Sequence, residues 1–278
     1  MTALFGSRPD RSDTAPVHTG SRATRVLGWM TLVGVGVLLL FAFVLSPEDA
    51  RVSPVDPGSV IGQSDAVRLM YIHVPSAIIA YVAFSITAVG SVMVLWKRSR
   101  WWDHVAHASA EIGVVFCGLT LVTGSIWGRP TWNTWWEWGD VRLVTTLILF
   151  LMYLGYLALR SVPADPDVQA RRAAIVALVA AIDIPIVNRS VEWWENRTLH
   201  QQSTLTDLKI EDLTLFTLVL GFAVFGLLFA WLLVHRFRTA WLQGEVERHG
   251  LSEALVERRA EADADVDAAV RIGGGDQR

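Results

Sequence analysis

The residues of this chain best suited to chemistry are a run of tryptophans and two histidines, His73 and His200. The run covers residues 127–140 and holds five of the 13 Trp residues. Because tryptophan favours the edge of a bilayer, one interpretation of the run is an interfacial belt. Belts usually place one or two aromatic residues at a helix end, whereas here five lie in one connection. The run therefore favours a flat apolar platform for a flat apolar ligand.

The spacing within the run predicts its local structure. Gly128 and Pro130 are expected to break regular structure at its start. Beyond Pro130 the tryptophans recur three and four residues apart, which on a helix at ~100° per residue predicts a broad aromatic face. These tryptophans are Trp132, Trp135, Trp136 and Trp138.

The two histidines suggest what the platform could hold. A neutral imidazole is a common iron ligand. Haem has an apolar ring, an iron that takes axial ligands, and two carboxylates that need cations. Arg129 and Arg142 flank the platform, and a guanidinium group holds a carboxylate bidentately. These residues together suggest a haem site in which His73 and His200 are the metal ligands.

Each of these residues also has an ordinary structural interpretation. A histidine near a helix end can cap the helix or lie at the interface. Arg129 and Arg142 can extend to the membrane surface, or they can pair with Glu137 and Asp140.

The elements that carry these residues are expected to be membrane-spanning helices. The chain is 52% hydrophobic with a mean hydropathy of +0.38, averages that decide little. The apolar residues are instead concentrated in runs of membrane-spanning length that polar connections separate. The expected fold is an all-α integral membrane protein with six transmembrane helices. The spans are expected at residues 26–45, 69–96, 105–126, 141–159, 173–187 and 213–234.

The flanking segments and the charges predict the orientation. Residues 1–25 are expected to form a disordered tail, 26–238 the membrane domain, and 239–278 a charged tail. Six spans put both termini on one side, and the shortest connections carry the basic clusters, which predicts that this side is cytoplasmic. The tryptophan-rich run, His73 and His200 then share the outer face, and the other five histidines do not.

Several classes of function are disfavoured. A net charge of −3 implies no nucleic-acid partner. The single cysteine, Cys117, excludes an internal disulfide and a multi-cysteine metal site. No nucleophile, phosphate-binding loop or acid–base pair is visible, so the chain is not expected to be an enzyme. Asp183 and Glu111 are costly in lipid and should face the protein interior or water, and Pro185 suggests an opened helix.

Three segments carry a resemblance to a known family. The segment 127–143, with its tryptophans followed by Asp140 and Arg142, resembles the tryptophan-rich signature of haem-handling proteins in cytochrome c assembly. The segments 71–77 around His73, and 190–201 around His200, are similar to the two histidine motifs of the six-span CcmC family. The three motifs occur in order, so the resemblance covers about residues 26–238.

The resemblance implies that haem b (iron protoporphyrin IX) is bound transiently at the outer face of a bacterial cytoplasmic membrane. The haem would pass to a chaperone of the CcmE type, with release driven by an ABC transporter pair of the CcmA/CcmB type and helped by a small membrane protein of the CcmD type. His73 and His200 would be the axial ligands, and the tryptophans would contact the ring. The candidate cofactor-binding residues are His73, His200, Trp127, Arg129, Trp132, Trp135, Trp136, Trp138, Asp140 and Arg142.

The sequence departs from the family pattern in places and leaves other functions open. Asn133 stands where the family usually has Gly, while Gly139 and the pair Glu195 and Asn196 are insertions. One alternative is a b-type cytochrome, which would need tightly held haem, usually ligated by histidines within the spans. A second is a transporter permease with its intramembrane acids lining a path.

Overall fold

The computed structural model describes residues 21–50, 62–200 and 212–274, and the regular elements of these residues are helices apart from one isolated β-bridge. In chain order the helices are α1 (Arg22–Leu40), α2 (Met70–Lys97), α3 (Arg100–Trp132), α4 (Val141–Ser161), α5 (Pro166–Ala181), α6 (Asp183–Trp193) and α7 (Asp212–Gly274). A π-helical turn, Phe41–Leu45, extends α1, and 3₁₀ turns at Asp65–Leu69 and Glu195–Arg197 precede α2 and follow α6.

Six helical stretches in the described part of the chain are long and apolar enough to cross a membrane. The helices α5 and α6 together make one of these stretches, Pro166–Trp193. The predicted fold class, an all-α membrane protein with six spans, is confirmed.

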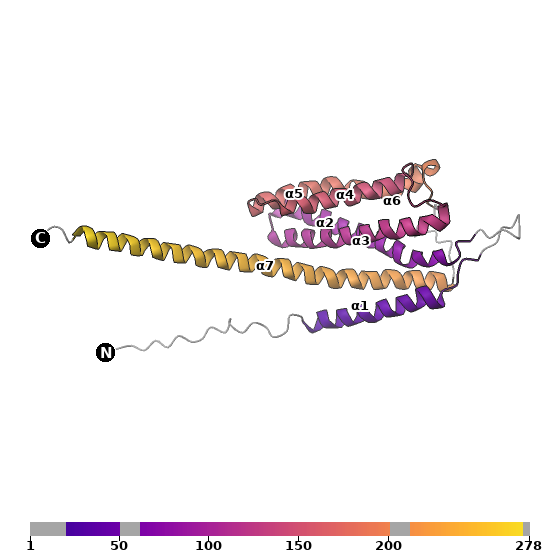
Figure 1. The fold of residues 1–278 in the computed structure, drawn as a ribbon, viewed down its shortest axis with the longest axis horizontal. Helices are drawn as coiled ribbons and strands as arrows, with labels where there is room; N and C mark the ends of the chain where they lie inside the picture. Colours follow the sequence, from indigo (N-terminus) through magenta and orange to yellow (C-terminus); the bar gives the residue numbers. More distant parts are fainter. Residues whose placement is uncertain (1–20, 51–61, 201–211, 275–278) are drawn as a thin grey trace.

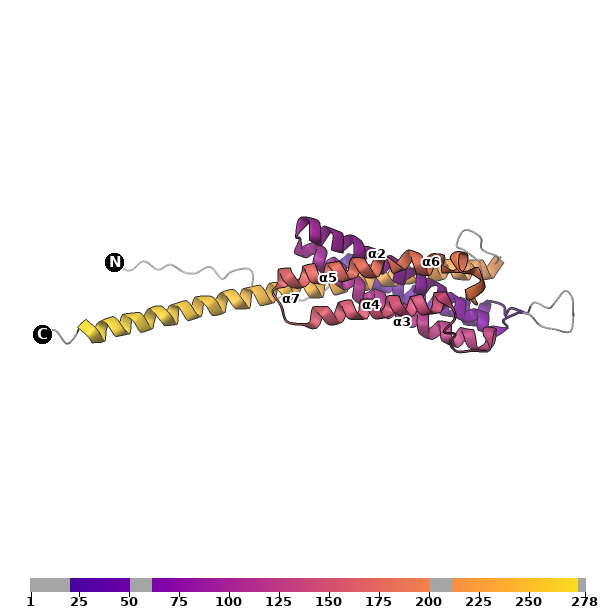
Figure 2. The same cartoon turned by 90° about the horizontal axis from the view of Figure 1, so that it is seen from above.

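The helices are arranged in two groups (Figure 1). The helices α2 to α6 form a bundle, and α1 packs against α7 along one side of it. The helix α3 packs against α2, α4 and α7, so it connects the two groups. Viewed from above, α7 runs along the bundle and then projects far beyond it (Figure 2). The start of α1 and the far end of α7 lie toward the same end of the molecule.

Small residues allow the central helices to approach closely. A Cβ atom on Gly113 of α3 would lie 2.6 Å from the Phe84 ring of α2, so only glycine fits there. The Phe84 ring stacks on Tyr153 of α4 with centroids 3.8 Å apart. In a membrane, where the lipid is as apolar as the core, such close packing supplies much of the helix association.

The end of α3 differs from its expected structure. Gly128 and Pro130 do not break the helix, which continues to Trp132. Pro130 lies in the last turn, where its missing N–H removes a single helical bond, and Asn133 then ends the helix in the left-handed conformation with φ 57°. Residues 134–140 are not helical, so the expected single aromatic face is wrong. Trp127 and Trp132 lie on α3, and the other three tryptophans of the run lie in the loop before α4.

The expected interruption of the fifth span is confirmed. The helix α5 ends at Ala181, and α6 begins at Asp183. Pro185 falls in the first turn of α6, where an N–H has no helical partner to lose.

The helical stretches at the two chain ends are longer than the expected spans. The helix α7 passes the boundary expected after residue 238 without a break. At the other end, residues 1–20 lie outside the described residues, whereas Arg22 already begins α1, with Ser21 as its N-cap.

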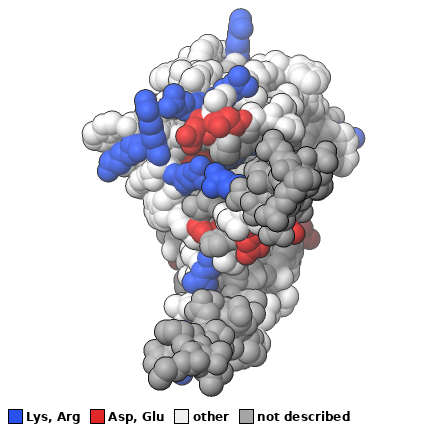
Figure 3. All heavy atoms as spheres, turned by 90° about the vertical axis from the view of Figure 1, so that its left-hand side faces the viewer, with Lys and Arg blue, Asp and Glu red and all other residues white. Residues whose placement is uncertain are grey.

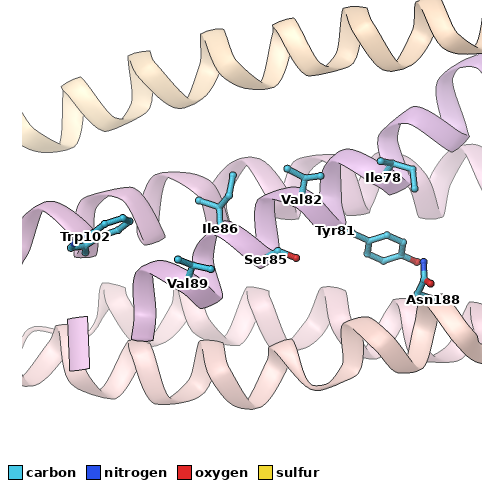
Figure 4. A pocket seen from close by; sticks show the side chains of 8 residues that line it. All are labelled: Ile78, Tyr81, Val82, Ser85, Ile86, Val89, Trp102 and Asn188. Atoms are coloured by element: carbon cyan, nitrogen blue, oxygen red, sulfur yellow. The ribbon is translucent and has the colours of Figure 1, made fainter. Parts of the chain in front are cut away.

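A lateral groove of about 540 Å³ runs along α2 between Trp102 and Asn188 (Figure 4). Its lining is almost wholly apolar, and the Tyr81 hydroxyl points toward Asn188 at one end. None of the candidate haem residues lines it, so the groove is separate from the site considered next.

Candidate functional site

His73 lies near the start of α2 with its ring turned toward α3. Its Nδ1 atom lies 3.1 Å from the Thr120 carbonyl oxygen and 3.1 Å from the Thr123 hydroxyl oxygen. A carbonyl can only accept, and the Thr123 hydroxyl itself donates to the Leu119 carbonyl at 2.7 Å. Nδ1 therefore carries the proton and donates, which leaves the lone pair on Nε2. This is the arrangement in which a histidine is ready to bind a metal through Nε2.

The space for the His73 ring comes from a glycine. A Cβ atom on Gly124 would lie 2.9 Å from His73 Cε1, closer than carbon atoms normally approach. On the other side, the Trp127 ring meets the imidazole edge-on, with centroids 5.5 Å apart. Trp127 is held in turn, because its Nε1 donates to the Gln63 side chain at 2.8 Å.

Asp140 organises the second half of the site. It is the N-cap of α4, and its Oδ1 accepts from the Leu143 N–H at 2.9 Å. Its Oδ2 accepts from the Leu199 N–H at 2.6 Å and from the Thr198 hydroxyl at 3.2 Å. The His200 Nδ1 lies 3.5 Å from the same oxygen. One buried carboxylate thus ties the segment before His200 to the start of α4.

The environment of Asp140 keeps it charged. Burial of the carboxyl would raise its pKa, but the contact with the His200 side chain and the backbone N–H donors of Leu199 and Leu143 lower the pKa to about 2. An anion facing Nδ1 favours the proton on that nitrogen, so His200 also has Nε2 as its free lone-pair atom.

The tryptophans bring the two histidines to the same end of α3. The His200 ring lies against Trp132 with centroids 4.9 Å apart, as His73 lies against Trp127. Five residues of helix separate these tryptophans, a rise of about 7.5 Å. In neither histidine does Nε2 hydrogen-bond to any residue that the structure describes.

The remaining tryptophans of the run form an open aromatic surface beside this pair. Trp135 and Trp138 are 59% and 73% exposed. Trp136 is half-buried and meets Trp138 edge-on at 5.6 Å. Its Nε1 atom is buried and has no hydrogen-bond partner among the described residues. Exposure of this many large apolar rings is typical of a binding surface.

Comparison with known proteins gives the family. The family model of CcmC, described as heme exporter protein C, matches residues 12–252. A "Heme exporter protein C" of Haemophilus influenzae is 36% identical over 228 residues, covering 80% of this chain and 86% of the relative. Proteins of the same name from Bradyrhizobium diazoefficiens and Escherichia coli are 37% and 34% identical, covering 86% and 83% of this chain and 88% and 89% of the relatives.

The chain belongs to the CcmC family. The conformation of Asn133 gives a physical reason for the departure that the sequence predicted at this position. Position 133 ends α3 with a positive φ, and asparagine is the residue that best replaces glycine in that conformation.

The two candidate arginines of this CcmC-family chain do not pair with acids as one interpretation expected. Arg129 donates through Nη1 to the carbonyl and side chain of Asn133, which caps the end of α3. Arg142 donates to the Asn188 carbonyl at 3.0 Å and to the Ser190 hydroxyl at 3.3 Å, which ties α4 to α6. Within the described residues, neither pairs with Glu137 or Asp140.

Three residues that support the site were missed in the sequence. Thr120, Thr123 and Gly124 form the socket for His73, and no sequence motif marks them. A weak sequence pattern could have indicated this socket. The three polar or small residues recur at i, i+3 and i+4 in an apolar span, and so share one helix face.

Proposed function

We propose that this CcmC-family chain binds haem at the outer face of a bacterial cytoplasmic membrane and delivers it to a haem chaperone for c-type cytochrome biogenesis. The observation that carries the proposal is the pair His73 and His200. Each presents an Nε2 lone pair at the same end of α3, beside an open tryptophan surface. The names of the relatives support haem as the cargo.

The cargo is haem b, bound transiently with His73 and His200 as axial ligands. Trp127 and Trp132 pack against the two imidazoles, and the exposed Trp135 and Trp138 contact the porphyrin. An open apolar surface suits handover, because a partner can reach the ring without the site unfolding.

The propionates are held by Arg129 and Arg142. Arg129 uses only Nη1 in its bonds to described residues, and Arg142 uses only Nε and Nη2. Each guanidinium group therefore keeps donors for a carboxylate.

The opposite end of the molecule faces the cytoplasm, together with both termini. Viewed from the end toward which α7 projects, Lys and Arg side chains gather on the upper part of this face, with Asp and Glu side chains between and below them (Figure 3). The ends of α2 to α5 that lie here contribute basic residues, as expected of a cytoplasmic side: Lys97, Arg98, Arg100, Arg160, Arg171 and Arg172.

The partners are those of a haem delivery system. They are a haem chaperone of the CcmE type, an ABC transporter pair of the CcmA/CcmB type and a small membrane protein of the CcmD type. The chain has no nucleotide-binding motif in its sequence, so these partners supply the energy, and its own part is to bind and present haem rather than to catalyse a reaction.

The experiment is a haem titration of the purified chain followed by absorption. We expect a Soret band in the wild type and at least 10-fold weaker binding in His73→Ala and His200→Ala. His104→Ala, at the opposite end of α3, is the matched control and should bind like the wild type. Equal haem affinity in all four proteins would overturn the proposal.

A further inference from the structure

We infer that Asp140 is a positioning residue for His200 rather than a haem contact, and that it makes His200 the more strongly electron-donating of the two iron ligands. The inference rests on the proposed function, since it assumes that His73 and His200 ligate haem iron.

The geometry leaves Asp140 no surface for haem. Its side chain has 0% exposure, and both of its carboxylate oxygens are engaged. Oδ1 accepts from the Leu143 N–H, while Oδ2 accepts from Leu199 and Thr198 and faces His200 Nδ1. A carboxylate enclosed in this way acts on haem only through the residues that it holds.

The position of His200 depends on the Asp140 carboxylate, because His200 does not lie on a helix. It follows the short 3₁₀ turn Glu195–Arg197 in an extended segment. The hydrogen bonds to Asp140 from residues 198 and 199 fix that segment against the first turn of α4.

The two histidines face groups of different charge, although His200 Nδ1 makes no hydrogen bond to any described residue. His73 donates to a neutral carbonyl and a neutral hydroxyl, whereas His200 Nδ1 faces a carboxylate. A carboxylate 3.5 Å away stabilises positive charge on the imidazole and so raises the basicity of Nε2. His200 therefore donates more electron density to iron and favours the ferric state, and His73 is the weaker ligand, the one released first when haem leaves.

The decisive variant is Asp140→Ser. Serine is a good N-cap, so α4 keeps its start, but its side chain is too short to reach residues 198–200 and carries no charge. We expect haem affinity to fall about 10-fold, the range typical for loss of a partner that orients a metal-binding histidine. We also expect the reduction potential of the bound haem to rise. Asp140→Glu should recover part of both properties.

Two controls separate this role from a general effect of charge or folding. Glu137→Gln removes one negative charge from the same loop, where the Glu137 side chain accepts only from the Gly139 N–H among described residues. That variant should leave affinity and potential unchanged. In a His200→Ala chain, Asp140→Ser should not lower the residual haem affinity any further, because the histidine through which Asp140 acts is gone.

The outcomes distinguish the two levels of the argument. If the wild type binds no haem, or if His200→Ala binds it normally, the proposed function fails and the inference fails with it. If His200→Ala loses haem while Asp140→Ser keeps wild-type affinity and potential, only the inference is overturned. An equal shift in Glu137→Gln and Asp140→Ser would also overturn it.

Discussion

The two ends of α3 contain the same kinds of residue in different arrangements. At the end near Arg100, which is the inner end in the proposed orientation, His104 lies edge-on to Phe237 and Trp241 of α7. Gly244 of α7 packs close to the His104 ring, because a Cβ atom at position 244 would lie 3.7 Å from His104 Nε2. At the outer end, His73 and His200 also lie against aromatic rings, but no described residue bonds their Nε2 atoms.

The charges differ in the same way. At the inner end, Arg160 of α4 forms a bidentate pair with Asp103 of α3, both distances being 2.7 Å. Arg236 of α7 pairs with Glu111, which also lies 3.5 Å from His107 Nε2. These ion pairs satisfy one another and join three helices. At the outer end, Arg68 and Arg189 also pair with acids, but Arg129 and Arg142 keep donors that bond to no described residue.

The comparison shows that residue types near a helix end do not define a site. A site requires that the reactive atom is available, and this availability depends on the hydrogen bonds and ion pairs that each side chain already makes. Glu111, which a permease would need as part of a polar path, is neutralised by Arg236, and this weakens that alternative.

The largest expected difference between the two ends concerns c-type cytochrome assembly in cells after replacement of an outer or an inner histidine. We expect His73→Ala or His200→Ala to reduce c-type cytochrome assembly by at least 10-fold, because each removes an iron ligand. His104→Ala and His107→Ala should leave assembly near the wild-type level. The measurement is haem staining of c-type cytochromes, with the amount of membrane-inserted chain as control. Equal loss from inner and outer variants would break the distinction between the two ends.

A second effect concerns the socket of His73. In Gly124→Ala the added Cβ would collide with His73 Cε1 and force the ring from its two acceptors. We expect haem affinity to fall several-fold without unfolding, because alanine favours the helix by roughly 1 kcal/mol. Gly155→Ala, on α4 with no atom within 4 Å of the added Cβ, is the matched control. Normal haem affinity in Gly124→Ala would count against a tightly fitted imidazole.

The exposed tryptophans should have a smaller effect. We expect Trp135→Ala combined with Trp138→Ala to slow transfer of haem to an acceptor several-fold, because these rings present the porphyrin. Thermal stability should hardly change, since both side chains are mostly exposed. Trp96→Ala with Trp101→Ala removes two exposed rings at the inner end and is the control. Unchanged transfer in the outer pair would support the interfacial belt instead.

The smallest effect on haem is expected from the inner ion pairs. Glu111→Gln leaves Arg236 half-buried without its partner and should lower the free energy of unfolding by roughly 1–2 kcal/mol. Haem affinity should remain at the wild-type level. A double-mutant cycle with Arg236→Gln should show that the two losses are not additive. A loss of haem in Glu111→Gln would mean that the two ends of α3 are coupled.

Much of the fold could be predicted because a membrane imposes simple rules. A span needs a continuous apolar run, so the six stretches were visible in the sequence, as was the break at Asp183 and Pro185. The end of α3 could not be placed, because a proline in a last turn costs little and the stop depends on the conformation of Asn133.

The candidate site was only partly predictable. The histidines and tryptophans were visible by type and spacing, and the structure places His73 and His200 against the same helix end. Their role as iron ligands stays a prediction. The partners that orient them come from long-range contacts between α2 and α3 and between α4 and residue 200. Such contacts, like the pairing of Glu111 with Arg236, leave no local pattern.

The most direct test of the central claim is the electron paramagnetic resonance spectrum of ferric haem bound to the purified chain. The two-histidine site predicts a low-spin signal in the wild type. In His73→Gly and in His200→Gly the signal should become high-spin, and added imidazole should restore the low-spin form by filling the vacated position. An unchanged low-spin signal in either variant would contradict the claim that these two histidines hold the iron.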